Sequence, residues 1–352
     1  MKNIKVLLVI LFLFLALKTF AQNIRKDILL NSNWLSIADE KNINAHNGFE
    51  NSNYKSTSWR AVNVPHNWDQ YEGYQRKLHG NKHGYAWYRK NFKSNEIKAG
   101  KRFFLYFEGV GSYATIWLNG KKVGYHAGGR TTFTLDVTSV IKLNNQENLL
   151  AVRADHPANI QDLPWVDGGC STERGFSEGS QPMGIFRPVH LIVTNEVRIE
   201  PFGVHIWNDD KISEKSAVLN FETTVKNYGS SSKNIIIINQ LVDANGKVVK
   251  ELKRNEKIAT GKDLVINQQS DKLTNPKLWS LENPYLYTVK TKILENGKLI
   301  DELNTPYGIR WISWPIGENT NQKVFLLNGK PVFVNGIAEY EHLIGQSHAL
   351  SY

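Results

Sequence analysis

The feature that most constrains the fold of this 352-residue chain is a pattern of short alternating runs with no helical stripe between them. The run 112–118 sets Tyr113, Thr115 and Trp117 on one face against Ala114, Ile116 and Leu118 on the other. Asn119-Gly120 follows it, a dipeptide suited to the positive φ angles of a tight hairpin turn. Similar runs lie at 102–107, 121–126, 132–135 and 148–154. This pattern predicts a two-sheet antiparallel sandwich.

A second β unit begins near Val197 and has its own turns, Asn245-Gly246 and Asn296-Gly297. Seven short runs over about 110 residues are typical of an immunoglobulin-like sandwich, which does not require a disulfide. The expected strands are 203–207, 217–226, 234–242, 248–252, 263–268, 285–294 and 298–303.

The run from Lys323 to His342 reads as a hairpin followed by the opening strand of a further domain. Apolar triplets at 325–327 and 332–334 flank Asn328-Gly329, and the second triplet starts an expected strand at 332–335. Only ten residues follow His342. The sequence therefore predicts a third domain that this chain begins and does not finish.

The first 21 residues have the pattern of a secretory signal peptide. Lys2 and Lys5 precede an apolar run at 6–17, which is too short to span a bilayer of about 30 Å, and a small residue, Ala21, precedes the expected cut. No cysteine directly follows the cut, so no lipid anchor is expected. The mature chain is predicted to be soluble and exported, either periplasmic or secreted.

Composition narrows the possible partners. The formal charge of +10 falls to +7 without the leader, and the lysines are scattered among acids, so a solvated basic surface is expected and nucleic-acid binding is not. Cys170 is the only cysteine, which excludes an internal disulfide. The histidines are dispersed, and His79 with His83 lies in a Gly/Asn-rich stretch without helical support. No metal site and no cofactor are predicted.

Five segments together resemble the N-terminal part of glycoside hydrolase family 2, the β-galactosidase, β-glucuronidase and β-mannosidase group, and most of all its exported β-galactosidase-like members. They occur in the family's order and extend over nearly the whole mature chain. These segments are 64–68 with 86–89, 107–123, 184–189, 276–279 with 283–287, and 307–310 with 327–331.

The resemblance implies the domain plan. A signal peptide at 1–21 is followed by a jelly-roll sugar-binding-type domain at 22–197 and an immunoglobulin-like sandwich at 198–306. Residues 307–352 would be the truncated start of a catalytic (β/α)₈ barrel, a fold that typically needs about 250 residues.

The resemblance also implies the chemistry and its place. A retaining glycosidase needs two carboxyl groups roughly 5 to 5.5 Å apart, and in this family both are glutamates on the barrel. We therefore expect no catalytic residue in this chain, which should be inactive alone. The pairs Glu173 with Glu178 and Glu339 with Glu341 are not expected to be catalytic, since acids at such spacing are usually solvated surface and neither pair matches the family's glutamates.

Three residues are candidates for contact with a glycan or β-galactoside substrate. Glu178 lies six residues before Gly184, in the loop that reaches the barrel mouth in the family; the alternative is an exposed loop glutamate. Glu341 and His342 resemble a Glu-His pair on the family's first barrel strand, with a structural role at the barrel base as the alternative. The segment 66–68 also matches a family signature and is expected to fix a strand end.

The sequence thus favours a β-galactosidase-like glycosidase represented by its non-catalytic N-terminal domains. A stand-alone secreted glycan-binding protein built from the same two sandwiches is the competing interpretation, and sandwiches that act only as scaffold are a third. The choice among galactose, glucuronic acid and mannose stays open at this point, as does the oligomeric state.

Overall fold

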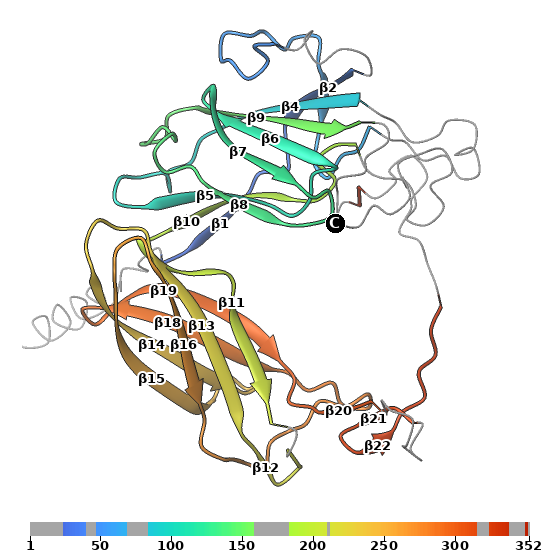
Figure 1. Cartoon of the computed structure of the whole chain (residues 1–352), viewed down its shortest axis with the longest axis vertical. Helices are drawn as coiled ribbons and strands as arrows, with labels where there is room; N and C mark the ends of the chain where they lie inside the picture. The colour runs from blue at the N-terminus through green and yellow to red at the C-terminus, as the bar shows by residue number, and fades with distance from the viewer. Residues whose placement is uncertain are drawn as a thin grey trace, which may run out of the picture.

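The chain folds into antiparallel β-sheets throughout the part that the structure describes (Figure 1). The computed structural model describes residues 24–39, 47–68, 84–157, 183–209, 212–314, 324–337 and 349–350. Within these ranges no helix has the length and apolar character needed to span a bilayer. The all-β class predicted from the alternating runs is confirmed.

The first sandwich pairs a six-stranded sheet with a four-stranded one. The larger sheet contains β2 (Trp34–Asp39), β3 (Arg60–Val62), β4 (Gly84–Phe92), β6 (Tyr113–Leu118), β7 (Lys121–Ala127) and β9 (Asn148–His156). The smaller sheet contains β1 (Lys26–Leu29), β5 (Arg102–Phe107), β8 (Phe133–Asp136) and β10 (Val189–Thr194). Their orders are β3-β2-β4-β9-β6-β7 and β1-β10-β5-β8. All five strands predicted in this region are present.

The core of the first sandwich follows the alternation of its strands. Ala114, Ile116 and Leu118 on β6 are fully buried and join the main apolar cluster between the two sheets. Trp117, on the opposite face of β6, stacks on Trp87 with ring centroids 5.1 Å apart. Burial of each large apolar side chain contributes about 1.5 to 3 kcal/mol, so the inward face fixes the register of the sheet.

The second sandwich has a three-stranded and a four-stranded sheet, with a short pair at one end. The strands are β11 (Val197–Asn208), β13 (Leu219–Asn227) and β16 (Asp263–Gln269), then β14 (Lys233–Val242), β15 (Val248–Ile258), β18 (Tyr287–Glu295) and β19 (Lys298–Tyr307), and finally β12 (Ser216–Ala217) with β17 (Leu273–Thr274). The sheet orders are β11-β13-β16 and β15-β14-β18-β19. The seven predicted strands are confirmed, and β15 extends six residues beyond its expected end.

Three of the Asn-Gly pairs form the turn that the sequence predicts. Both residues have positive φ at Asn119-Gly120, Asn296-Gly297 and Asn328-Gly329, for example 54° and 80° in the first. At Asn245-Gly246 only the glycine does, with φ 82°. There the Asp243 side chain accepts hydrogen bonds from the backbone N–H groups of Asn245 and Lys247, which shapes a different turn.

The C-terminal region departs from the prediction at one strand. A small sheet of β20 (Ile312–Ser313), β21 (Leu326–Leu327) and β22 (Lys330–Pro331) contains the expected hairpin. Residues 332–335, predicted to open a barrel, form no strand, and no barrel is seen in the described residues. A strand needs a hydrogen-bonding neighbour along its length, and the backbone bond that the described residues show for 332–335 is the one from the Val332 N–H to Phe325 O at 2.9 Å.

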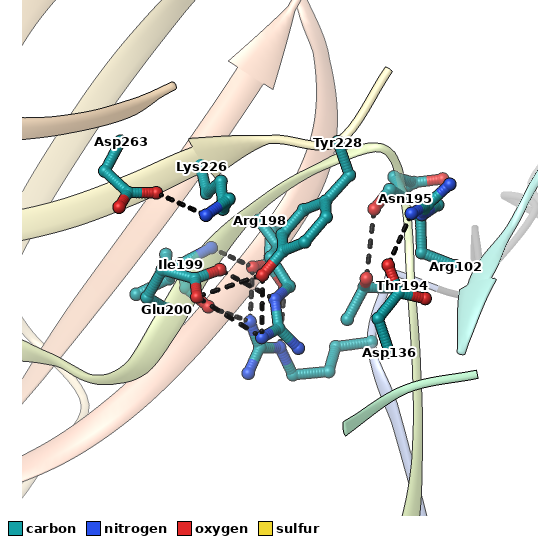
Figure 2. A network of polar contacts seen from close by, with 12 residues as sticks. Arg102, Asp136, Thr194, Asn195, Arg198, Ile199, Glu200, Lys226, Tyr228 and Asp263 are labelled. Atoms are coloured by element: carbon teal, nitrogen blue, oxygen red, sulfur yellow. Dashed lines mark hydrogen bonds and ion pairs between the residues drawn. The ribbon is translucent and has the colours of Figure 1, made fainter. Parts of the chain in front are cut away.

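Aromatic and polar side chains join the two sandwiches, and Figure 2 shows the polar contacts among Arg198, Glu200 and Tyr228. The Arg198 guanidinium of β11 lies 3.4 Å from the ring centroid of Phe104 on β5, and its Nε donates to Glu200 at 2.9 Å. Tyr228 packs edge-on against Phe104 and donates its hydroxyl proton to Glu200 at 3.1 Å. Burial raises the pKa of Tyr228 to about 12, so this hydroxyl stays protonated as a donor.

Candidate functional site

The segments 66–68 and 183–185 contact each other at one end of the first sandwich. The backbone N–H of His66 donates to Ile185 O at 2.7 Å, and that of Trp68 donates to Met183 O at 3.0 Å. Asn67 Oδ1 accepts from the Met183 N–H at 2.9 Å, and Trp68 Nε1 donates to Ser36 at 2.9 Å. The signature segment therefore holds the chain that leads into β10, which is the structural role expected for it.

His66, which is partly buried, and Tyr88 form a polar pair at this end. Nδ1 of His66 lies 2.8 Å from the Tyr88 hydroxyl, and Tyr88 is fully buried. Burial, and secondarily the charge of Arg60, lowers the pKa of His66 to about 4, so the imidazole is neutral at pH 7. A neutral ring can accept a hydrogen bond at Nδ1 from the Tyr88 hydroxyl.

Only glycine fits at position 184, beside this pair. Its φ is +150°, and a Cβ at this position would lie 2.2 Å from the Tyr88 hydroxyl and 2.8 Å from the backbone oxygen of His66. Gly184 also pairs with Gly111 through an isolated β-bridge, which closes the end of the sandwich.

A second polar pair, Ser112 with His156, lies beside that bridge. Ser112 Oγ is 2.8 Å from His156 Nδ1, the reach of a nucleophile and its general base. Both residues are buried, with 2% and 0% of their surface exposed, so no substrate can approach the hydroxyl. The adjacent Asp155 is held by both Arg153 Nε and Nη2, at 2.7 and 2.8 Å. The pair is therefore structural.

The first candidate substrate contact lies in the stretch of sequence between His156 and Met183. Glu178 lies outside the described residues, between His156 at the end of β9 and Met183, which are both fully buried. Glu341 and His342 also lie outside the described residues, beyond Ile337. All three candidates therefore stay predictions that the described residues do not test.

A separate hollow of about 1040 Å³ lies between the second sandwich and the β21–β22 hairpin. The hairpin is attached by Asn328, which donates to Trp279 O at 2.9 Å and accepts from the Trp311 N–H at 3.1 Å. Phe333 borders the hollow and is 85% exposed, and in the same short run Val334 is 65% and Ile337 is 90% exposed. Several large apolar side chains exposed in one run are typical of a contact surface.

No metal centre is evident in the described part of the chain, where no group of three or more His, Cys, Asp or Glu side chains could hold an ion. Sequence reasoning missed the roles of Tyr88, Arg198 and Asp301, whose partners are distant along the chain. His66 and Tyr88 are 22 residues apart, and Arg198 packs on a ring of the other sandwich. No local pattern carries such a signal.

Comparison with family models gives two consecutive matches. The sugar binding domain of glycosyl hydrolases family 2 matches residues 28–195, and the model named for glycosyl hydrolases family 2 matches residues 197–310.

Curated relatives carry glycosidase names. Beta-galactosidase BoGH2A of Bacteroides ovatus is 30% identical over 296 residues, covering 82% of this chain and 32% of the relative. A beta-glucuronidase of Bacteroides fragilis is 29% identical over 346 residues, covering 96% of this chain and 45% of the relative. The chain thus spans less than half the length of these two relatives.

Solved structures show the same arrangement. A beta-glucuronidase from glycoside hydrolase family 2 aligns with TM-score 0.78 and 26% identity, over 95% of this chain and 35% of that one. A family 2 member from Bacteroides cellulosilyticus aligns with TM-score 0.68 and 26% identity, over 86% of this chain and 38% of that one.

Proposed function

The chain belongs to family 2 of the glycosyl hydrolases, and from that premise we propose that it is the N-terminal part of an exported, β-galactosidase-like glycosidase. The observation that carries the proposal is the uninterrupted pair of family matches, which together run from residue 28 to residue 310. Relatives named as β-galactosidases and β-glucuronidases support both sugars as substrate classes.

The hydrolytic step is proposed to use residues outside this chain. A retaining mechanism needs one carboxyl group as acid/base and a second as nucleophile, on either side of the glycosidic bond. The relatives extend well beyond the matched part, and we assign both carboxyl groups to that extension. The exposed Phe333 and Ile337 are then surface that the extension covers.

The role proposed for this chain is to contribute loops to the substrate pocket. Glu178 would accept a hydrogen bond from a sugar hydroxyl, a charge-assisted contact, and the described residues on either side of its segment, His156 and Met183, are buried. Glu341 and His342 would line the floor of the same pocket. Export, inferred from residues 1–21, is part of the proposal.

The test has two parts. The purified chain should not turn over aryl β-galactosides or aryl β-glucuronides, and turnover by this chain alone would contradict our assignment of the chemistry. Fusion of residues 22–352 to the unmatched part of the Bacteroides fragilis relative should produce hydrolysis of one substrate. A folded fusion without activity on either substrate counts against the proposed function.

The fusion also tests the candidate contacts. Glu178→Gln should lower kcat/KM by about tenfold. Glu173→Gln, a carboxylate nearby in the same sequence stretch, should leave kcat/KM unchanged. Equal effects of the two substitutions would contradict a role for Glu178 in the proposed pocket. Glu341→Gln and His342→Ala test in the same way whether these two residues line the floor of the pocket.

The match to a sugar binding domain supports a second candidate, a glycan-binding protein that needs no hydrolysis. Titration calorimetry of this chain with galactosides separates the candidates, since heat of binding without turnover favours the binder and absence of heat favours a scaffold.

A further inference from the structure

The outer face of the three-stranded sheet of the second sandwich carries an exposed aromatic pair. β11 turns Ile206 into the core, and its neighbours His205 and Trp207 therefore point outward. Their rings stack with centroids 4.8 Å apart at 28°, and Trp207 is 38% exposed. His205 thus fixes the orientation of an indole that is still open to solvent. Figure 1 shows this sheet, β11-β13-β16, as one side of the sandwich.

Polar side chains continue the two rows that the aromatic pair begins. Across the sheet, Glu222 and then Asn267 stand in the row of His205. Asn220 and then Gln269 stand in the row of Trp207. Cross-strand partners share a face, so these groups surround the indole. Gln269 Nε2 donates to Asn220 Oδ1 at 2.9 Å, and this bond leaves the Asn220 amide and the Gln269 carbonyl for a ligand.

The charged groups on this face indicate which class of ligand it can bind. Its two rows contain the Glu222 carboxylate and no lysine or arginine. The nearest lysine on the outer side of β13, Lys226, is two rows away and forms an ion pair with Asp263 at 3.0 Å. Arg254 of β15 donates to the backbone oxygen of Asn267 at 2.9 Å at the edge of this face, and its charge is already matched by an ion pair with Glu256. A uronic acid or another anion would therefore meet the Glu222 carboxylate, while the nearby cations already have anionic partners.

We propose that this face binds a neutral oligosaccharide. The C–H face of a pyranose ring is apolar and slightly positive, so it packs on the negative face of an aromatic ring. The hydroxyl groups of the same sugar can donate to Glu222 and to the amide oxygens, and they can accept from the amide N–H groups. The site is distinct from the proposed pocket loop, and it does not rest on the proposed hydrolysis.

The experiment is a titration of the full chain followed by NMR of the tryptophan indole N–H groups, with the Trp207 signal assigned from Trp207→Phe. Neutral galacto- and manno-oligosaccharides up to about 10 mM are compared with oligogalacturonate of equal length. We expect the Trp207 signal to move with at least one neutral sugar. Trp207→Ala should weaken that binding by about tenfold or more, and Glu222→Gln should weaken it several-fold.

A matched control is available, because Trp314 is 64% exposed and its ring packs against Phe325 instead of His205. Trp314→Ala should leave the affinity unchanged, and circular dichroism should show that all variants stay folded. The proposal fails if no neutral sugar moves the Trp207 signal, if oligogalacturonate binds equally well, or if binding survives Trp207→Ala. If Trp207→Ala instead abolishes self-association in ultracentrifugation, the face is a protein interface and the proposal is wrong.

Discussion

Arg25 and Asp301, which are 276 residues apart in the sequence, form a bidentate ion pair that joins the two sandwiches. Arg25 Nε and Nη2 donate to the two carboxylate oxygens of Asp301 at 2.9 and 2.6 Å. The carboxylate also accepts from the Ile199 N–H at 2.7 Å and is fully buried. A segment that precedes β1 of the first sandwich is therefore fastened to β19 and β11 of the second.

Removal of the carboxylate should loosen this junction. Asp301→Ala leaves the guanidinium and a buried N–H without their acceptor, and we expect a loss of about 3 kcal/mol in the free energy of unfolding. Urea denaturation followed by tryptophan fluorescence measures it. Asp271→Ala removes an 82% exposed partner of Lys250 and should have no measurable effect. Equal stability of the two variants would mean that the junction contributes nothing.

How much the sequence could predict depends on the distance over which each feature is encoded. The alternation at 113–118 and the turn at Asn119-Gly120 depend on adjacent residues, and both are confirmed. The prediction of a strand at 332–335 is wrong, because a strand forms only beside a second strand that accepts and donates its hydrogen bonds, and a local sequence pattern does not contain that partner.

The contacts at the sandwich end and at the junction show the same limit. Gly184 sits beside Tyr88 because three segments converge there, and Arg25 finds Asp301 only once both sandwiches have formed. Nothing adjacent to Tyr88 or Asp301 in the sequence indicates these partners. For Glu178, Glu341 and His342 the resemblance to the family remains the sole basis.

His66 should make the protein sensitive to acid. Its pKa is about 4 in the folded protein and about 6.5 when unfolded, so the unfolded chain binds more protons between these values. The stability that the neutral ring contributes is present above pH 6.5 and is lost as the pH falls to 4, by up to about 3 kcal/mol. In His66→Asn, the difference between urea midpoints at pH 7 and pH 4.5 should shrink. The exposed His205→Asn is the control, and an unchanged pH dependence in His66→Asn would contradict the assignment.

His190 should make the free energy of unfolding depend on pH in the opposite direction to His66. Its Nδ1 lies 2.7 Å from Asp27 and its Nε2 3.1 Å from Glu108, and the hydrogen bond to Asp27, followed by the effect of Glu108, raises its pKa. The stability it contributes is therefore present below the ordinary pKa of about 6.5 and is lost as the pH rises through the raised value. His190→Gln should lower the free energy of unfolding more at pH 5.5 than at pH 9, by about 1 kcal/mol at the acidic value because the partners are partly exposed. An equal loss at both pH values would show that packing, and not charge, explains the effect.

Gly184 provides the sharpest test of the sandwich end. Gly184→Ala places a methyl group 2.2 Å from the Tyr88 hydroxyl at a φ of +150°, and we expect a loss of about 3 kcal/mol. Gly246→Ala is the matched control, because its φ is also positive, at +82°, but a Cβ there meets nothing within 4 Å; a loss of about 1 kcal/mol is expected.

The steric cause can be separated from the backbone cause by removing the hydroxyl. Tyr88→Phe alone should cost about 1 kcal/mol through the lost bond to His66. Combined with Gly184→Ala, it creates room for the methyl group, so the double variant should be more stable than the sum of the single losses predicts. Additive losses in urea denaturation would place the cost in the backbone of Gly184 and its contact with the His66 oxygen, and Tyr88 would then have no part in selecting glycine at this position.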